Sequence, residues 1–206
     1  MLIVGAGVQG RAHLEAFIAG FDVRDVRIAS HTRASPEALA THARASGAQS
    51  TVVDDPNPAP AHHPLLLTCT SAQAVALHGL TRSDAFVAAV SAFTPQMVEW
   101  APGVVRAIAA SGTIIVDTRD ADHEAGDLLQ AGLKVSAPAT LRDVVRDDRS
   151  QARAPIPASM MFKRWPGRLG FGGGALRHAG PIRTPIKRLS IPRTTLDKEP
   201  LHARRL

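Results

Sequence analysis

Three glycines near the start of the chain have the spacing of a phosphate-binding turn. They follow a short apolar run, residues 2–4, and precede a segment with apolar residues at helical spacing. Between a strand and a helix, G-x-G-x-x-G makes the turn, admits a pyrophosphate close to the backbone and packs helix against strand. The pyrophosphate then sits at the helix N-terminus, facing free N–H groups. We predict a dinucleotide site formed by Gly5, Gly7, Val8, Gln9 and Gly10.

Polar residues about 20 positions further on indicate which dinucleotide is preferred. An NAD site usually presents Asp or Glu there to the ribose 2′-hydroxyl. This chain instead has Ser30, His31, Thr32 and Arg33. A carboxylate would repel a 2′-phosphate, whereas Arg33 can bind one through charge-assisted hydrogen bonds. We therefore expect NADP(H) to be favoured over NAD(H); the alternative is a solvated polar loop after a strand.

Short hydroxyl side chains follow a later apolar run, where ribose and nicotinamide contacts usually lie. Thr68, Cys69 and Thr70 stand there, and they allow a ligand to approach closely. An ordinary turn with Ser/Thr backbone bonds is the alternative. Cys69 is expected to be a small buried residue rather than a nucleophile. Val90 and Ser91, after the next apolar run, complete the predicted cofactor contacts.

An acidic run at residues 117–124 raises the question of a metal site. Its spacing matches no standard ligand set. A strand end followed by a helix with an acidic first turn explains the same residues, so we expect no metal. His13, one turn into the first expected helix, is expected to pack or cap rather than to catalyse.

These residues must be positioned by strands and helices that alternate along the chain. The pattern predicts strands at 2–4, 26–29, 51–53, 65–68, 86–90 and 113–116, and helices at 8–19, 36–46, 96–110 and 122–131. Such alternation implies βαβ units and a parallel sheet. Right-handed crossovers then give an α/β, doubly wound, Rossmann-like fold that binds ligands at the carboxyl ends of its strands.

The basic charge is confined to the last quarter of the chain. Residues 1–150 hold 12 Lys and Arg against 16 Asp and Glu, whereas residues 151–206 hold 12 against 2. Together with the loss of periodicity, this predicts a NAD(P)-binding domain at 1–148 and an irregular Pro/Gly/Arg-rich tail at 149–206. The single cysteine fits a reducing compartment. The apolar run at 2–4 is too short for a signal peptide or membrane span, so we expect a cytoplasmic protein without membrane contact.

The motifs, taken in order, resemble those of the ornithine cyclodeaminase/μ-crystallin family. The matching stretches are 4–17, 30–32, 68–71, 86–93 with Pro95 and Glu99, and 116–117 with 124–127. The chain is most similar to bacterial members that reduce the cyclic imines Δ1-pyrroline-2-carboxylate and Δ1-piperideine-2-carboxylate with NAD(P)H. The resemblance thus implies a reductase that forms proline or pipecolate from a cyclic imino acid.

Three departures from the family pattern qualify this resemblance. Ornithine cyclodeaminases carry an aspartate where this chain has Phe93, and phenylalanine cannot relay a proton. Cyclodeamination is therefore disfavoured, and hydride transfer, whose chemistry the cofactor supplies, fits better. His31 replaces an arginine, so Arg33 has to compensate as phosphate ligand. Ser91 stands where glycine is usual, and its side chain would crowd the nicotinamide.

The resemblance also implies a further domain ahead of the glycine motif. In the family that domain carries the homodimer contact and the basic residues that hold the substrate carboxylate. The present chain starts one residue before the first predicted strand, so we expect a fragment. No catalytic acid or carboxylate clamp can be assigned within it. The alternative function is therefore a catalytically inactive dinucleotide-binding fragment or pseudogene product.

The tail departs from the family after Phe162 and Lys163. A one-base shift of GC-rich codons there permits the reading S-G-G-R-A-G-W-D-L-A-A-A, which restores the family pattern. We therefore hypothesise a frameshift near Phe162, which the DNA of the locus tests. A basic nucleic-acid-binding arm is the rival interpretation. It is disfavoured, because the tail has few aromatic residues and no RGG repeat.

Overall fold

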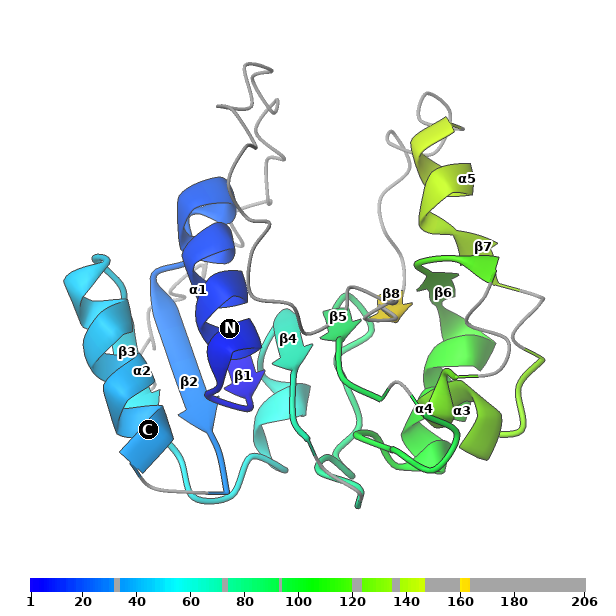
Figure 1. The fold of residues 1–206 in the computed structure, drawn as a ribbon, viewed down its shortest axis with the longest axis horizontal. Helices are drawn as coiled ribbons and strands as arrows, with labels where there is room; N and C mark the ends of the chain where they lie inside the picture. Colours follow the sequence, from blue (N-terminus) through cyan, green and yellow to red (C-terminus); the bar gives the residue numbers. More distant parts are fainter. Residues whose placement is uncertain are drawn as a thin grey trace, which may run out of the picture. The chain divides into compact units, whose positions relative to one another are not determined.

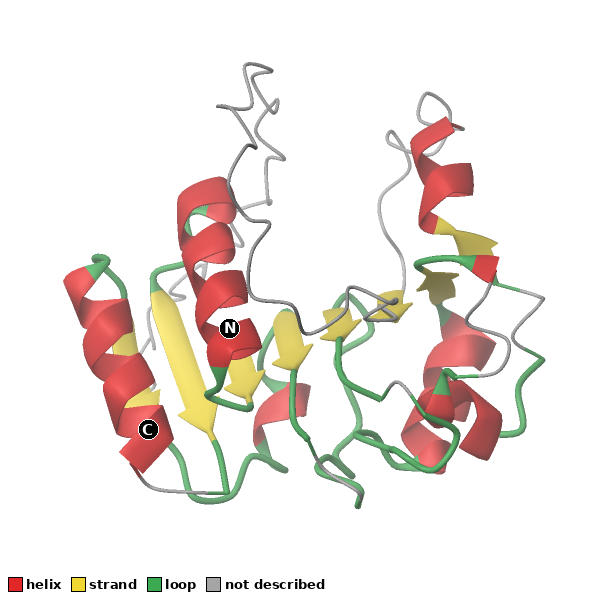
Figure 2. Cartoon of the chain, in the orientation of Figure 1, coloured by secondary structure: helices red, strands yellow, loops and turns green. Residues whose placement is uncertain are grey.

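Strands and helices alternate along a computed structural model that describes residues 1–31, 34–71, 74–92, 94–119, 124–134, 138–146 and 160–163 (Figures 1 and 2). The strands are β1 (Leu2–Val4), β2 (Asp25–Ala29), β3 (Gln49–Val52), β4 (Leu65–Thr68), β5 (Phe86–Ala89), β6 (Thr113–Val116), β7 (Ala139–Thr140) and β8 (Met160–Lys163). The helices are α1 (Val8–Phe21), α2 (Ala34–Ala45), α3 (Pro102–Ser111), α4 (Gly126–Gln130) and α5 (Leu141–Arg146), with a 3₁₀ turn η1 (Ala59–Ala61). All of them belong to one unit, Met1–Gly174.

The described strands form a single sheet in the order β3-β2-β1-β4-β5-β8-β6-β7, and every neighbouring pair is parallel. Val4 lies opposite both Ala29 of β2 and Thr68 of β4, and Thr68 lies opposite Ala89 of β5. The chain runs outward from β1 to β3 and then returns to the other side of β1. The predicted doubly wound parallel fold is confirmed, and its topological switch point lies between β1 and β4.

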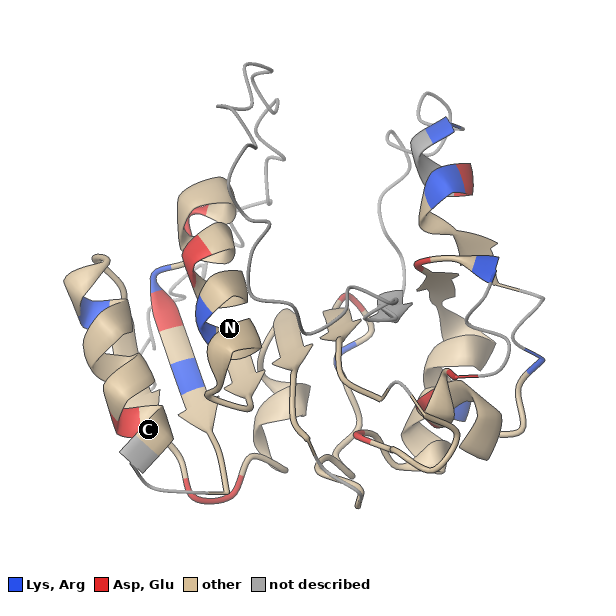
Figure 3. Ribbon diagram, viewed as in Figure 1, with Lys and Arg blue, Asp and Glu red and all other residues tan. Residues whose placement is uncertain are grey.

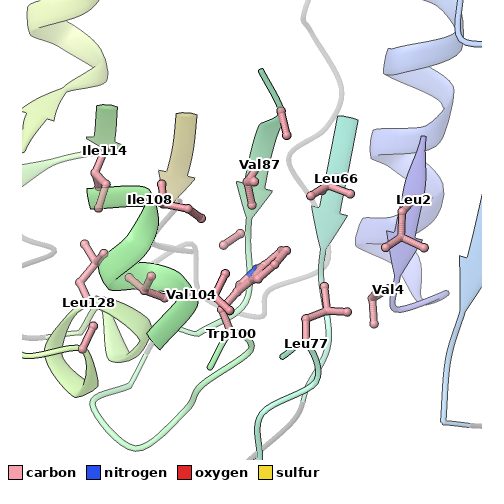
Figure 4. Packing of buried hydrophobic residues seen from close by; sticks show 14 of the residues in the cluster. Leu2, Val4, Leu66, Leu77, Val87, Trp100, Val104, Ile108, Ile114 and Leu128 are labelled. Carbon is pink, nitrogen blue, oxygen red and sulfur yellow. The ribbon is translucent and has the colours of Figure 1, made fainter. Parts of the chain in front are cut away.

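The two faces of the sheet bury separate apolar clusters, because successive side chains of a strand point to opposite faces. Leu2 and Val4 belong to the cluster that packs against α3 and α4. Ile3, between them, belongs to the cluster that packs against α1 and α2. Figure 4 shows the first cluster, in which the Trp100 indole lies between Leu77 and Val104. Both faces of the central strands are therefore shielded from solvent by apolar side chains.

All four predicted helices have bounds that differ from the sequence prediction, and the structure explains the differences for α1 and α3. Helix α1 continues through Gly20 to Phe21, whose ring lies 5.5 Å from that of Phe17. It ends where Asp22 adopts a left-handed conformation (φ 55°), which Asp tolerates better than most residues. Helix α3 begins at Pro102 instead of residue 96, because the Ala101 N–H is bonded to the Leu77 carbonyl and proline favours a first helical position.

Strand β8 corrects one part of the predicted domain division. Residues 160–163 lie in the stretch expected to be an irregular tail, yet they pair with β5 on one side and β6 on the other. The sheet therefore extends past residue 148. The rest of the predicted tail lies outside the described residues. Among those described, no helix is both long and apolar enough to cross a membrane.

Candidate functional site

The turn between β1 and α1 needs glycine at two positions for steric reasons. Gly5 is buried and has a φ of 108°, which side chains rarely adopt, and a Cβ there would collide with the Cys69 carbonyl. A Cβ on Gly10 would collide with the Gly5 carbonyl. These contacts bring the turn, the end of β4 and the start of α1 together. The first and third glycines thus have the turn-making and packing roles predicted for them.

Gly7 differs, because a Cβ there would meet no atom within 4 Å. It is exposed and is the N-cap of α1, and glycine has no side chain with which to cap the first N–H groups of the helix. Val8 is 85% exposed, which is unusual for an apolar residue, and Gln9 is also exposed. The helix N-terminus therefore faces open space, as an anion-binding turn requires.

Residues at the end of β2 lie beside this turn. The Gly5 N–H donates to the Ala29 carbonyl at 2.9 Å, and the half-buried Ser30 and exposed His31 follow. Thr32 and Arg33, on which the preference for NADP(H) depends, lie outside the described residues. Ser30 and His31, the first two of the four residues predicted to face the ribose, therefore lie next to the glycine turn.

The threonines after β4 point inward instead of toward the open turn. Thr68 and Thr70 are buried, and both hydroxyls donate to the Glu99 carboxylate, at 2.9 and 3.0 Å. The Cys69 thiol donates to the Gly5 carbonyl at 3.1 Å. Burial, together with the nearby charge of Glu99, raises the pKa of Cys69 to about 12. The thiol stays protonated at neutral pH, so Cys69 is a small buried residue and not a nucleophile, as the sequence predicts.

Glu99 is a buried acid beside the site to which the sequence alone gives no role. It is only 1% exposed, and its carboxylate binds groups from two strand ends. Besides the two hydroxyls, it accepts the Thr70 N–H at 2.7 Å and the Ser91 N–H at 3.3 Å. In the sequence it was noted only within the family resemblance. Its position between Val98 and Trp100, in an apolar run, is the signal that could have identified a buried acid.

A second buried acid, Asp127, binds the backbone on either side of Glu99 Cα and so holds that segment in place. Asp127 Oδ1 accepts the backbone N–H groups of Glu99 at 2.7 Å and Trp100 at 3.1 Å. Gly126 has no room for a side chain, because a Cβ there would collide with the carbonyls of Thr94 and Met97. We call Thr68, Thr70, Glu99, Trp100 and Asp127 the buried polar cluster.

Val90 and His13 lie beside residues of this site. Val90 is buried after β5, where its N–H donates to the Thr68 carbonyl at 2.9 Å. His13 Nδ1 lies 2.8 Å from the Gln9 carbonyl oxygen within α1. Within the described residues, no group of three or more His, Cys, Asp or Glu could hold a metal ion. Residues 120–123 and Phe93 are outside that part.

Comparisons with known proteins agree with the arrangement. A model of the ornithine cyclodeaminase/mu-crystallin family matches residues 1–154. The chain is 30% identical over 145 residues to Delta(1)-pyrroline-2-carboxylate reductase 1 of Burkholderia multivorans, covering 70% of this chain and 46% of that protein. Identity is also 30% over 145 residues to the Delta(1)-pyrroline-2-carboxylate/Delta(1)-piperideine-2-carboxylate reductase of Azospirillum brasilense, covering 70% and 45%.

A solved structure has the same fold. The Delta(1)-pyrroline-2-carboxylate reductase of Thermococcus litoralis, in complex with NADH and L-proline, superimposes with a TM-score of 0.70 at 19% identity. The match covers 79% of this chain and 51% of that one. The chain therefore spans about half the length of the relatives it matches.

Proposed function

We propose that this chain, which belongs to the ornithine cyclodeaminase/mu-crystallin family, provides the NADP(H)-binding part of a cyclic imino acid reductase. The reaction would add a hydride to the imine carbon and a proton to the ring nitrogen, converting Δ1-pyrroline-2-carboxylate to proline or Δ1-piperideine-2-carboxylate to pipecolate. The observation that carries the proposal is the open glycine turn at the switch point of the sheet. The similarity to two pyrroline-2-carboxylate reductases supports the substrate class.

The cofactor supplies the hydride, and this chain's residues hold and orient it. The uncapped first turn of α1 would bind the pyrophosphate through backbone N–H groups and the positive end of the helix dipole. Ser30, His31, Thr32 and Arg33 would face the adenosine ribose. The backbone at Thr70 and Ser91 would face the nicotinamide half, across the switch point.

Titration of NADPH and NADH, followed by fluorescence, tests the cofactor proposal. We expect both to bind and NADPH to bind about tenfold more tightly, because Arg33 would pair with the 2′-phosphate. Arg33→Ala should bring the two affinities together. Arg27→Ala is the matched control, because Arg27 is an exposed arginine within β2 and should leave the ratio unchanged. Absence of binding by the unaltered chain would overturn the proposal.

Turnover is a separate measurement. Because the chain spans about half the length of its relatives, a second candidate function is dinucleotide binding without catalysis by this polypeptide. NADPH oxidation in the presence of Δ1-pyrroline-2-carboxylate distinguishes the two: a substrate-dependent rate supports the reductase, and binding without a rate supports the second candidate. We expect no ammonia release from ornithine, because Phe93 cannot relay a proton. A cytoplasmic location would suit a protein whose one cysteine stays a thiol.

A further inference from the structure

We propose that Glu99 is a positioning residue for the nicotinamide half of the dinucleotide site. Its buried carboxylate holds the backbone after β4 and the backbone after β5 in one fixed arrangement. The inference rests on the proposed dinucleotide function and adds to it a residue that would never touch the ligand. Burying a carboxylate costs free energy unless its oxygens are hydrogen-bonded. The groups that donate to the Glu99 carboxylate therefore show which backbone segments it holds.

The Glu99 carboxylate binds groups from both strand ends: Oε1 binds the end of β4, and Oε2 binds both β4 and the residue that follows β5. Oε1 accepts both the N–H and the hydroxyl of Thr70, at 2.7 and 3.0 Å. Oε2 accepts the Thr68 hydroxyl at 2.9 Å and the Ser91 N–H at 3.3 Å. The two backbone N–H groups come from residues 21 positions apart, and the carboxylate is the group they share. Displacing it would release both strand ends together.

The carboxylate does not depend on those strand ends for its own position. The Glu99 N–H donates to Asp127 Oδ1 at 2.7 Å. The Glu99 carbonyl accepts the N–H groups of Ala76 at 2.9 Å and Leu77 at 3.0 Å. Trp100, the next residue, is fully buried in the apolar cluster. The backbone of Glu99 is thus fixed by the scaffold, and its side chain transmits that fixed position to the ends of β4 and β5.

The topology assigns these strand ends to the nicotinamide side. Strands β4 and β5 lie on the opposite side of β1 from β2 and β3. In doubly wound sheets a dinucleotide crosses the switch point, so its two nucleotides lie over opposite halves. With the pyrophosphate at the β1–α1 turn and the adenosine toward β2, Thr70 and Ser91 lie under the nicotinamide ribose and ring. Hydride transfer is sensitive to misplacement of about 1 Å.

Glu99→Gln tests the inference, because an amide cannot accept at both ends. If its oxygen keeps the shorter bond to Thr70, its NH₂ faces the Ser91 N–H, and two donors oppose each other. We expect the Kd for NADPH to rise about tenfold, and the Kd for 2′-phospho-ADP, which lacks the nicotinamide ring and its ribose, to stay unchanged. A variant that is merely less stable would shift both affinities or neither.

Trp100→Phe is the matched control. It removes the indole N–H that donates to Thr68 Oγ1 at 3.1 Å, one residue from Glu99, without removing an acceptor for either strand end. We expect it to lower the midpoint of thermal unfolding and to leave the ratio of the two Kd values unchanged. If Glu99→Gln does not fold, Glu99→Asp takes its place, since the shorter carboxylate cannot reach both strand ends.

The outcomes separate this inference from the proposed function. If the unaltered chain binds neither NADPH nor 2′-phospho-ADP, the dinucleotide function fails, and the inference with it. If the unaltered chain binds both and the Glu99 variant changes both Kd values equally or not at all, only the positioning role is overturned. A selective loss of NADPH affinity, absent in Trp100→Phe, supports it.

Discussion

Two glutamates, one beside each half of the sheet, show how differently the halves are held together. Glu15 on α1 is exposed, and its carboxylate lies near two basic side chains: Arg11 Nε at 3.2 Å and His42 Nε2, from α2, at 2.7 Å. Glu99 is buried, and its carboxylate accepts hydrogen bonds from the uncharged N–H and O–H groups of Thr68, Thr70 and Ser91. Figure 3 shows charged residues along α1, α2 and β2 and none on the central strands β1, β4 and β5.

The two halves of the sheet should therefore lose stability through different kinds of substitution. Around β1 and β2, the close approach of backbone segments and apolar packing set the structure, and exposed ion pairs contribute little. Around β4 and β5, a buried polar cluster sets it, and each missing partner leaves a desolvated group. The first half should therefore be sensitive to added volume, and the second to the loss of hydrogen-bonding groups.

The largest effect should come from removing β8. A chain that ends at residue 148 would lose the strand between β5 and β6, leaving two open edges within the sheet. We expect it to lose cooperative thermal unfolding by circular dichroism, whereas a chain that ends at residue 174, the end of the first unit, should retain it. Equal stability of the two would support the predicted boundary at 148 and overturn the assignment of β8 to the sheet.

The next largest effect should follow Gly10→Ala, which tests the first half. The added methyl group would meet the Gly5 carbonyl, a backbone atom that cannot move aside. We expect the free energy of unfolding to fall by about 3 kcal/mol and NADPH binding to be lost. Gly7→Ala is the control: with open space around it, stability should fall by at most about 1 kcal/mol, the cost of alanine at an N-cap, while NADPH binds more weakly. Denaturant titration and fluorescence measure the two effects, and equal destabilisation by both alanines would contradict the steric account.

Asp127→Ala tests the second half. It leaves the buried N–H groups of Glu99 and Trp100 without their carboxylate acceptor. We expect a loss of about 2 kcal/mol in denaturant unfolding. The control is Asp143→Ala, because Asp143 Oδ2 also accepts an N–H, from Thr140, but is exposed to water. The loss in the free energy of unfolding should be clearly smaller for Asp143→Ala than for Asp127→Ala. Similar losses from both variants would mean that burial does not decide the outcome.

The sequence predicted the first half of the site better than the second, for a physical reason. The glycine turn is local: the glycine spacing, the strand before it and the start of the helix lie within about ten residues, so the sequence alone predicts the roles of Gly5 and Gly10. The buried polar cluster is assembled from residues 68 to 127, and no local pattern joins Glu99 to Thr70. The hydroxyls of Thr68 and Thr70 were predicted to approach a ligand, but they donate to that distant carboxylate. Strand β8 was missed similarly, because its partners are more than 40 residues away.

The smallest effect should come from Glu15→Gln. Its hydrogen bond to Arg11, and then the proximity of His42, hold the pKa of Glu15 below its usual value. A carboxylate with a lowered pKa in the folded state stabilises the fold above its ordinary pKa, and this contribution is lost as the pH falls through the folded pKa. Glu15→Gln should therefore be slightly less stable than the unaltered chain near neutral pH and equally stable in strong acid. Because the pair is exposed, high salt should remove the difference. Urea unfolding at both pH values and both salt concentrations measures it. A deficit as large as that of Asp127→Ala would contradict the distinction between the exposed and the buried carboxylate.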